Sequence, residues 1–373
     1  EEIIAYDGFE PSGRIHIAQA IMRAININKL TKEGIKFKML VADWHGWANN
    51  KMGGDLEKIQ TTGKYMIEVW KAAGMDMDNV EFVWASDLVK DDNYWKLVME
   101  VARSATLNRV IRCSQIMGRK EDEALQASQI LYPCMQAADI FYLGAKICQL
   151  GLDQRKVNML ARELGPKLGY YKPVSMSHHM LMGLSEPYPK VEDNLEDIKK
   201  AIEEKNADKL SSFKLFSNQK FMTKNLSNQL KGVKKRLKKG EADKELIKLL
   251  KKRLKEYDEE RQLSLKMSKS EPDTAIFMDD SKDDIDRKIK KAYCPEGEVE
   301  ENPLMEYAKY MIFEKFDKFV VERPEKFGGD LEFNSYKELA DSFSRKELHP
   351  MDLKTAIAEY IDRIIEPVRK HYK

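Results

Sequence analysis

The chain has 373 residues, of which 42% are hydrophobic and 34% charged, a composition typical of a globular protein with room for two domains. Its 64 basic and 62 acidic residues give a formal net charge of +2, which excludes a uniformly basic nucleic-acid binder. Any RNA contact must therefore use local patches. No apolar run approaches the ~20 residues of a membrane helix, and the N-terminus lacks a signal-peptide pattern.

The cysteines and histidines indicate no cross-links and no metal cage. The four cysteines show neither CxxC spacing nor a dense framework, which predicts free thiols in a reducing, cytoplasmic compartment. The six histidines are scattered apart from His178-His179, so no protein-bound structural metal is expected.

A strand, a loop and a helix open the chain. Residues 3–6 are an apolar run that predicts a buried strand. Residues 8–13 contain two glycines and a proline, which predict a loop. Apolar residues at every fourth position from Ile17 predict a helix. Free N–H groups at the start of that helix favour an anion. His16 and Gln19 leave one face of its first turn. This stretch alone fits either a phosphate site or a plain strand–turn–helix unit with a surface histidine.

The first half of the chain alternates strands with helices. Strands are predicted at residues 37–42, 80–84 and 146–150, and helices at residues 55–73, 91–103 and 153–164. This alternation predicts an α/β fold, a Rossmann-like parallel sheet with helices on both faces. Because ligands bind at the carboxyl ends of such strands, we expect Tyr6, Asp43 and Gly151, at or just past strand ends, to approach one another.

One predicted helix, around residues 131–143, is apolar on nearly every side and should be buried. Tyr132, Gln136 and Asp139 form a polar stripe on it, at spacings of four and three residues. Buried polar groups need partners. The stripe is therefore either an internal hydrogen-bond network or the wall of a ligand pocket made of a phenol, an amide and a carboxylate.

The last third of the chain predicts an all-helical C-terminal domain. Apolar residues recur at three- and four-residue spacing over residues 283–292, 303–313, 336–343 and 351–369. We place this domain at residues 281–373, after a Rossmann-like domain at residues 1–184, a helical basic insertion at residues 185–262, and the region of a Lys-Met-Ser-Lys-Ser loop at residues 263–280.

The predicted insertion has three amphipathic stripes, which begin at Val191, Leu226 and Leu246. Residues 209–239 hold ten basic residues and no acidic one. Such a block is often a solvated helical surface. A second interpretation is that this segment is a linker that is simply longer than usual. A third is that a helical hairpin adds sequence-independent contacts to the phosphates of an RNA.

The segment Lys266-Met267-Ser268-Lys269-Ser270 follows the insertion and places two cations and two hydroxyls in one loop. Such a loop can bind phosphate oxygens through charge-assisted hydrogen bonds. Together with His16-Ile17-Ala18-Gln19 it resembles the paired signature of class I aminoacyl-tRNA synthetases. With residues 6–13, the Tyr132 helix and Asp153-Gln154-Arg155-Lys156, the chain is similar to tyrosyl-tRNA synthetases of the archaeal and eukaryotic cytoplasmic type, except across residues 185–262.

This resemblance implies a set of site residues. Tyr6 and Asp139 are expected to hold the substrate phenol, and Tyr132, Gln136 and Gln154 its amino group. The expected ATP contacts are Gly8, His16, Ala18, Gln19, Lys266, Met267, Ser268, Lys269 and Ser270, of which His16, Gln19, Lys266 and Lys269 are expected to act on the phosphates. The residues expected to contact tRNA are Arg155, Lys156, Phe327, His349 and Asp352.

The resemblance further implies L-tyrosine, ATP with Mg²⁺, and tRNA(Tyr) as reactants, a homodimer, and no membrane. One departure is Ala18-Gln19, where the family pattern ends in Gly-His; Gln19 can donate a hydrogen bond but cannot carry a proton. His45 is either part of the pocket wall or a structural histidine. From spacing alone, Phe327 is typical of a core residue. Two other functions stay open: a tryptophanyl-tRNA synthetase, and a catalytically silent RNA-binding paralogue.

Overall fold

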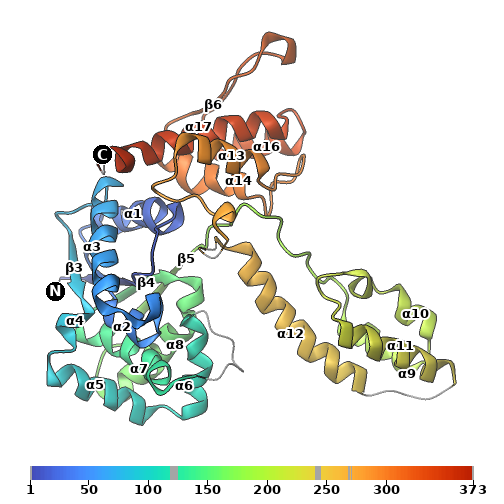
Figure 1. Ribbon diagram of the computed structural model, residues 1–373, viewed down its shortest axis with the longest axis horizontal. Helices are drawn as coiled ribbons and strands as arrows, with labels where there is room; N and C mark the ends of the chain where they lie inside the picture. The colour runs from blue at the N-terminus through green and yellow to red at the C-terminus, as the bar shows by residue number, and fades with distance from the viewer. Residues whose placement is uncertain (1, 118–124, 240–244, 268, 270, 372–373) are drawn as a thin grey trace. The chain divides into compact units, whose positions relative to one another are not determined.

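The chain forms two compact units in a computed structural model that describes residues 2–117, 125–239, 245–267, 269 and 271–371 (Figure 1). The first unit is Glu1–Leu181 with Lys269–Lys373, and the second is Met182–Ser268. The four domain boundaries given above remain predictions, since the first unit contains both the predicted Rossmann-like and C-terminal domains.

A five-stranded sheet with order β3-β2-β1-β4-β5 forms the centre of the first unit. Its strands are β1 (Ile4–Phe9), β2 (Lys36–Val41), β3 (Val80–Trp84), β4 (Ile147–Gly151) and β5 (Val174–His178). Every pairing is parallel, which confirms the α/β prediction. The chain runs to one side of β1 and then returns to the other, so the crevice beside its carboxyl end is where ligands bind in such sheets.

Strand β1 is longer than predicted, and Tyr6 lies inside it rather than at its end. Asp7 pairs with Met39 and Gly8 with Leu40, so the ladder continues to Phe9 through two residues that are poor strand formers. Strand β5 was not predicted, because its side chains are mostly exposed and carry no alternating pattern.

Helices cover the sheet. The first group is α1 (Ile17–Lys32) and α3 (Leu56–Ala72), which contact each other; the second is α5 (Asp92–Ser104), α7 (Ala127–Tyr142) and α8 (Arg155–Leu164), in which α7 contacts both neighbours. Three shorter helices are α2 (Asp43–Ala48), α4 (Ala85–Leu88) and α6 (Leu107–Cys113). Helix α3 begins and ends as predicted, because the Asp55 side chain caps it and Gly74 follows it with φ of +86°.

The C-terminal part of the first unit is mostly helical. Its helices are α13 (Lys282–Lys291), α14 (Pro303–Tyr307), α15 (Phe313–Lys315), α16 (Tyr336–Ser344) and α17 (Pro350–His371), with a π-helical turn at Ala308–Ile312. The expectation of an all-helical domain needs one amendment, an antiparallel pair of strands β6 (Phe319–Val321) and β7 (Leu331–Phe333). Strands of three residues are too short to show an alternating pattern.

The second unit contains α9 (Leu195–Glu203), α10 (Ala207–Ser212), α11 (Lys224–Lys238) and α12 (Glu245–Leu265). The predicted stripes on α9, α11 and α12 supply its core, in which Ile198, Val233 and Leu250 are buried. Aromatic residues complete this core: Phe221 and Tyr257 are fully buried and their rings pack edge to face. The unit is therefore a small folded domain with a hydrophobic core of its own.

Two smaller expectations concern the whole chain. All four cysteines are free, as predicted, and three of them are buried. In the described residues, no helix is both long and apolar enough to cross a lipid bilayer.

Gly63 tests how tightly α3 packs on the sheet. A Cβ atom at Gly63 would lie 2.8 Å from side-chain atoms of both Trp84 and Val41, which leaves no space for a methyl group. We predict that Gly63→Ala lowers the free energy of unfolding by about 1–3 kcal/mol in urea titrations, the usual result of overpacking. Gly46→Ala is the matched control, because its Cβ would lie 3.5 Å from Ile59, an ordinary contact. Equal effects at both positions would contradict this packing.

Candidate active site

The buried carboxyl group of Asp139 lies at the centre of the candidate site. Asp139 lies in α7 with 0% of its surface exposed. The Tyr94 hydroxyl in α5 donates a hydrogen bond of 2.8 Å to its Oδ1, and Nε2 of His45 in α2 lies 2.9 Å from its Oδ2. The contact with His45 is an ion pair when the imidazole is protonated, and it is not aligned as a hydrogen bond, since both atoms lack a hydrogen-bond partner among the described residues. Three helices thus meet at one carboxyl group.

The charge on His45 depends on this contact. Burial lowers the pKa of His45, but the negative charges of Asp139, Glu10 and Asp43 together outweigh burial, and the pKa of His45 is raised overall. Asp43 has a structural role of its own: it accepts hydrogen bonds from Ser86 N (2.9 Å) and Gln60 Nε2 (3.0 Å), which tie α2 to α4 and α3.

Tyr6 faces the same carboxyl group from the sheet. Tyr6 is buried in β1, and its pKa is raised well above the usual value by burial and then by the charge of Asp139. Gly8 lies two residues along the same face of β1, where a Cβ would come within 3.2 Å of the Tyr6 hydroxyl. The absence of a side chain at Gly8 therefore leaves space around the phenol.

The other members of the predicted stripe lie together as well. Gln136 Nε2 donates to Gln154 Oε1 at 3.2 Å, and Gln154 Nε2 donates to the Ile116 carbonyl at 3.1 Å. Burial, and then the charge of the nearby Glu10 carboxylate, raise the pKa of Tyr132 well above its usual value, and Glu10 also accepts a hydrogen bond from Asn49 Nδ2. The polar groups of the stripe thus have partners: Gln136 contacts Gln154, the Glu10 carboxylate lies near Tyr132, and Asp139 contacts Tyr94 and His45.

The first motif, His16–Gln19, is bound through its backbone to the segment after the second motif, Lys266–Ser270. His16 forms an antiparallel bridge with Phe277, and Ile17 N donates to the Ile276 carbonyl at 3.0 Å. No side chain caps the first turn of α1, which starts directly after His16. Ala18 and Gln19 lie in that turn, and Gln19 Oε1 is buried without a hydrogen-bond partner among the described residues. A buried acceptor without a partner costs about 1–3 kcal/mol, which a bound ligand can recover.

Lys269 reaches the loop that precedes α1. Its Nζ donates to Ser12 Oγ at 3.1 Å, so Lys269 contacts the loop directly before His16, and both residues belong to the first unit. Burial, and then the charge of Lys51, lower the pKa of Lys269 to about 8. Lys266 and Met267 belong to the second unit, where Lys266 bridges to Met182. Ser268 and Ser270 lie outside the described residues.

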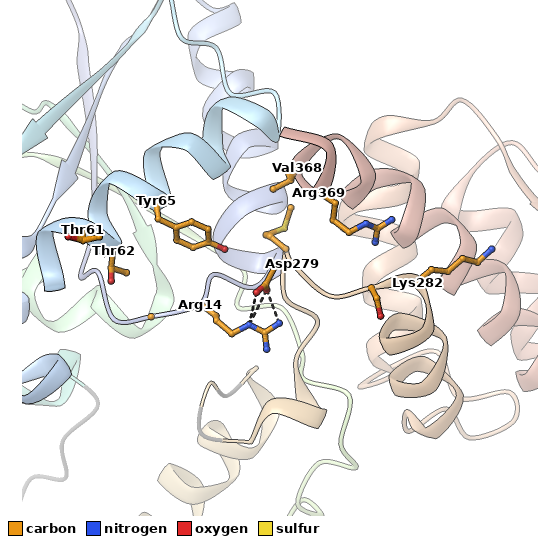
Figure 2. A pocket seen from close by; sticks show the side chains of 11 residues that line it. Arg14, Thr61, Thr62, Tyr65, Asp279, Lys282, Val368 and Arg369 are labelled. Atoms are coloured by element: carbon orange, nitrogen blue, oxygen red, sulfur yellow. Dashed lines mark hydrogen bonds and ion pairs between the residues drawn. The ribbon is translucent and has the colours of Figure 1, made fainter. Parts of the chain in front are cut away.

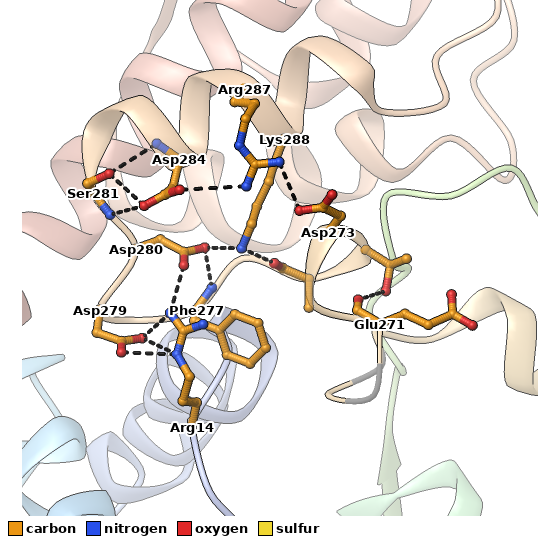
Figure 3. A network of polar contacts seen from close by, with 12 residues as sticks. Arg14, Glu271, Asp273, Phe277, Asp279, Asp280, Ser281, Asp284, Arg287 and Lys288 are labelled. Carbon is orange, nitrogen blue, oxygen red and sulfur yellow. Dashed lines mark hydrogen bonds and ion pairs between the residues drawn. The ribbon is translucent and has the colours of Figure 1, made fainter.

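A network of charges positions the segment that follows Lys269 (Figure 3). Arg14 pairs with Asp279 (2.7 Å) and Asp280 (2.8 Å), and its guanidinium lies 4.1 Å from the centre of the Phe277 ring. The buried Lys288 of α13 pairs with Asp280 at 2.6 Å and donates to the Ala275 carbonyl. Residues 275–280 are therefore held between the first motif and the C-terminal helices.

A separate cavity of about 860 Å³ lies beside the Arg14–Asp279 pair (Figure 2). It is lined by Gly13, by Tyr65 of α3 and by Val368 of α17, among others. Among the described residues, none that is predicted to bind substrate lines this cavity, and Asp139 and its contacts lie outside its lining.

The five residues expected to contact tRNA are all at the surface, in whole or in part. Arg155 and Lys156 are exposed at the start of α8. Phe327 is 60% exposed, so the alternative that it is a core residue is wrong. His349 is exposed, and its backbone carbonyl accepts a hydrogen bond from Asp352 N. The side chains of Phe327 and His349 are thus not needed for packing, and that of Asp352 is half-buried.

Sequence reasoning missed Tyr94 and Glu10. Tyr94 lies on the buried face of an amphipathic helix, where an aromatic residue is normally only a core residue. Glu10 follows β1 within the first motif, and its position just past a strand end was the one usable signal. His45, for which two roles stayed open, contacts Asp139 and is part of the site. No group of three or more metal-ligating side chains occurs among the residues that the structure describes.

Comparison with known proteins places these features in a family. A family model for class I tRNA synthetases (W and Y) matches residues 1–264 and 261–366. The chain is 43% identical over 373 residues to cytoplasmic tyrosine–tRNA ligase 1 of Arabidopsis thaliana, and the match covers 99% of this chain and 77% of the relative.

Solved structures agree with this result. The tyrosyl-tRNA synthetase of Pyrococcus horikoshii, crystallised with L-tyrosine, superposes with a TM-score of 0.78 at 35% identity, covering 100% of this chain and 88% of that one. A tryptophanyl-tRNA synthetase from Encephalitozoon cuniculi bound to tryptophan gives a TM-score of 0.61 at 15% identity, covering 100% and 78%, a likeness of fold alone.

The raised pKa of His45 predicts a pH-dependent stability. A group whose pKa is higher in the folded state stabilises the fold below its unfolded pKa, and this contribution is lost as pH rises through the folded value. We predict that wild type loses stability over that range and that His45→Asn lacks this loss. Urea unfolding of both proteins at pH values from about 5 to 8, where histidine titrates, measures the difference. A difference that is constant with pH would show that the pKa of His45 is not raised in the fold.

Proposed function

This chain belongs to the tyrosyl-tRNA synthetases of class I, and on that premise we propose that it activates L-tyrosine with ATP and transfers it to the 3′ end of tRNA(Tyr). In the first step, a carboxylate oxygen of tyrosine attacks the α-phosphorus of ATP, and the bond to the β-phosphate breaks to release pyrophosphate. In the second step, a ribose hydroxyl of the tRNA attacks the carbonyl carbon of tyrosyl-adenylate, and AMP leaves.

The observation that carries this proposal is the buried carboxyl group of Asp139 beside the Tyr6 phenol. An ionised carboxylate has about four acceptor positions, and Tyr94 and His45 contact one oxygen each. Capacity therefore remains for the hydroxyl of a bound tyrosine. Phenylalanine has no hydroxyl to offer, and a buried acceptor left without a donor costs free energy.

The amino group of tyrosine suits the other end of the polar stripe. Tyr132, Gln136 and Gln154 offer oxygen acceptors for an ammonium, and Gln136 and Gln154 already contact each other. The Glu10 carboxylate, which acts electrostatically on Tyr132, adds a negative charge there. The proposed pocket thus has a carboxylate for each polar end of the substrate.

The ATP phosphates would meet the first turn of α1 together with His16 and the lysines of the second motif. The substrate carboxylate is itself the nucleophile, so the first step needs no protein base. Catalysis is then mainly positioning and stabilisation of phosphate charge. Lys269, already in contact with Ser12, supplies a positive charge there, and Gln19 supplies an amide. Magnesium would arrive bound to ATP, which commonly provides its ligands.

The tRNA contacts, the oligomeric state and the location complete the proposal. Arg155 and Lys156 at the start of α8 suit the acceptor end, and the exposed Phe327 ring suits stacking on an unpaired anticodon base. His349 and Asp352 offer hydrogen-bonding groups nearby in the sequence. We place the enzyme in the cytoplasm as a homodimer, in line with the cytoplasmic relative from Arabidopsis.

Pyrophosphate exchange tests the proposal directly. We expect tyrosine, and neither tryptophan nor phenylalanine, to support ATP–pyrophosphate exchange. Because a hydrogen bond to a charged group is worth about 1.5–3 kcal/mol, Asp139→Asn should raise the KM for tyrosine by about 10- to 150-fold and leave the KM for ATP nearly unchanged. Exchange with tryptophan alone would indicate a tryptophanyl-tRNA synthetase, and no exchange with any amino acid would indicate the catalytically silent RNA-binding paralogue.

The lowered pKa of Lys269 predicts the pH profile of the first step. The lysine carries its charge below a pKa of about 8 and loses it above. At saturating tyrosine, kcat/KM for ATP should therefore fall as pH rises through about 8, since this ratio reports groups of the enzyme form to which ATP binds. In Lys269→Arg the charge persists over the whole range, so this fall should disappear. Identical profiles in both proteins would exclude Lys269 as the titrating group.

A further inference from the structure

Charge is divided unevenly between the two units. Residues 182–268 contain 22 basic and 15 acidic residues, a net charge of +7. The remaining 42 basic and 47 acidic residues give a net charge of −5. The near-neutral total of +2 is therefore the sum of a basic second unit and an acidic first unit. A concentration of positive charge is typical of a surface that binds a polyanion.

The excess positive charge lies on one helix. Along α11, the apolar residues Leu226, Leu230, Val233 and Leu237 are buried in the core of the second unit. The lysines at 231, 235 and 238 follow each other at four- and three-residue steps, so they share a face, and all are exposed. Successive lysines on this face advance by about 5–6 Å along the helix axis.

These lysines lack the carboxylate partners that other lysines of the unit have. Lys199 pairs with Glu196, Lys214 with Glu192, and Lys252 with Glu256. By contrast, no ion pair within the described residues is formed by Lys224, Lys231, Lys234, Lys235 and Lys238 of α11, or by Lys239 directly after it. Repulsion between lysines on one face disfavours the helix slightly, and a bound anion would relieve it.

The surrounding surface argues for a phosphate backbone over a membrane or an apolar partner. Every exposed large hydrophobic side chain in the described part of the chain lies outside residues 182–268. Membrane-binding helices and protein hot spots both require such side chains. The α11 face also lacks aromatic rings for base stacking, so its contacts would be to phosphates and would not depend on sequence.

We propose that the exposed lysine face of α11 is an RNA-binding surface that contacts phosphates of the tRNA. The identification of the RNA as tRNA rests on the proposed function. The folded core of the unit supports the surface: Arg253 donates to the carbonyls of Phe221 and Lys220 and pairs with Glu260, which holds the segment before α11 against α12. The lysines are therefore presented by a packed helix.

The test compares two triple variants with equal charge change. Lys231→Gln, Lys235→Gln and Lys238→Gln together remove the proposed face. Lys199→Gln, Lys214→Gln and Lys252→Gln remove three exposed lysines of the same unit that have carboxylate partners. Binding of a tRNA(Tyr) transcript and of an unrelated RNA duplex is measured at salt concentrations from about 50 to 200 mM, where phosphate contacts dominate the salt dependence.

We expect the α11 variant to bind both RNAs more weakly, with a plot of log K against log salt concentration that is shallower by about 2–3 units, close to one unit per lost contact. The control variant should keep the wild-type slope, and Arg at the three α11 positions should restore it. Equal slopes for the α11 variant and wild type overturn the proposal. So does loss of binding to vesicles of anionic phospholipid with RNA binding unchanged.

Tyrosine-dependent pyrophosphate exchange separates this inference from the proposed function. Exchange should be intact in both triple variants, because no residue of the pocket is changed. If wild type showed no exchange while the α11 variant still lost RNA binding, the proposed function would fail and the RNA surface would stand. Intact exchange together with an unchanged salt slope of RNA binding in the α11 variant would overturn the RNA surface and leave the proposed function standing.

Discussion

Burying the carboxyl group of Asp139 imposes a constraint on three helices. A charge taken out of water is expensive unless partners compensate for it, and here the partners come from Tyr94 in α5 and His45 in α2. The three helices are therefore fixed relative to one another by a polar contact as well as by packing. The charge of the same carboxyl group acts on Tyr6 in β1, so the group that ties the helices together is also the one that we propose binds the substrate phenol.

The sheet explains why the remaining groups lie near this carboxyl group. Glu10 directly follows β1, His45 lies in the short helix α2 that follows β2, and Gln154 follows β4. In a parallel sheet these three positions share one edge. The second motif is then brought to the first by backbone pairing between Ile17 and Ile276 and by the bond from Lys269 to Ser12, with Arg14 and Asp280 as a polar support.

The features that the sequence predicted well are those with a strong local pattern. Strand β3 and helix α3 were placed within a residue or so, because apolar runs, an Asp cap and a terminal glycine mark their bounds. The stripe of Tyr132, Gln136 and Asp139 was correctly identified, since a polar stripe on an apolar helix needs partners. Residues 182–268 form a folded unit whose core comes largely from the three predicted stripes.

The missed features are those that depend on long-range contacts. Strand β5 has an exposed side-chain pattern and is a strand only because β4 provides its hydrogen bonds. Tyr94 is separated from Asp139 by 45 residues, and nothing in its own helix indicates that its hydroxyl has a partner. The hairpin of β6 and β7 depends on Gly328 and Gly329, whose φ angles of +95° and +70° allow the turn between them.

A crystal structure of this chain with L-tyrosine bound tests the central claim most directly. The account predicts the phenolic oxygen within hydrogen-bond distance of an Asp139 carboxylate oxygen, about 2.5–3.0 Å, while the contacts of Asp139 with Tyr94 and His45 persist. Tyrosine bound with its phenol directed away from Asp139, or bound in the cavity beside Arg14, would contradict it.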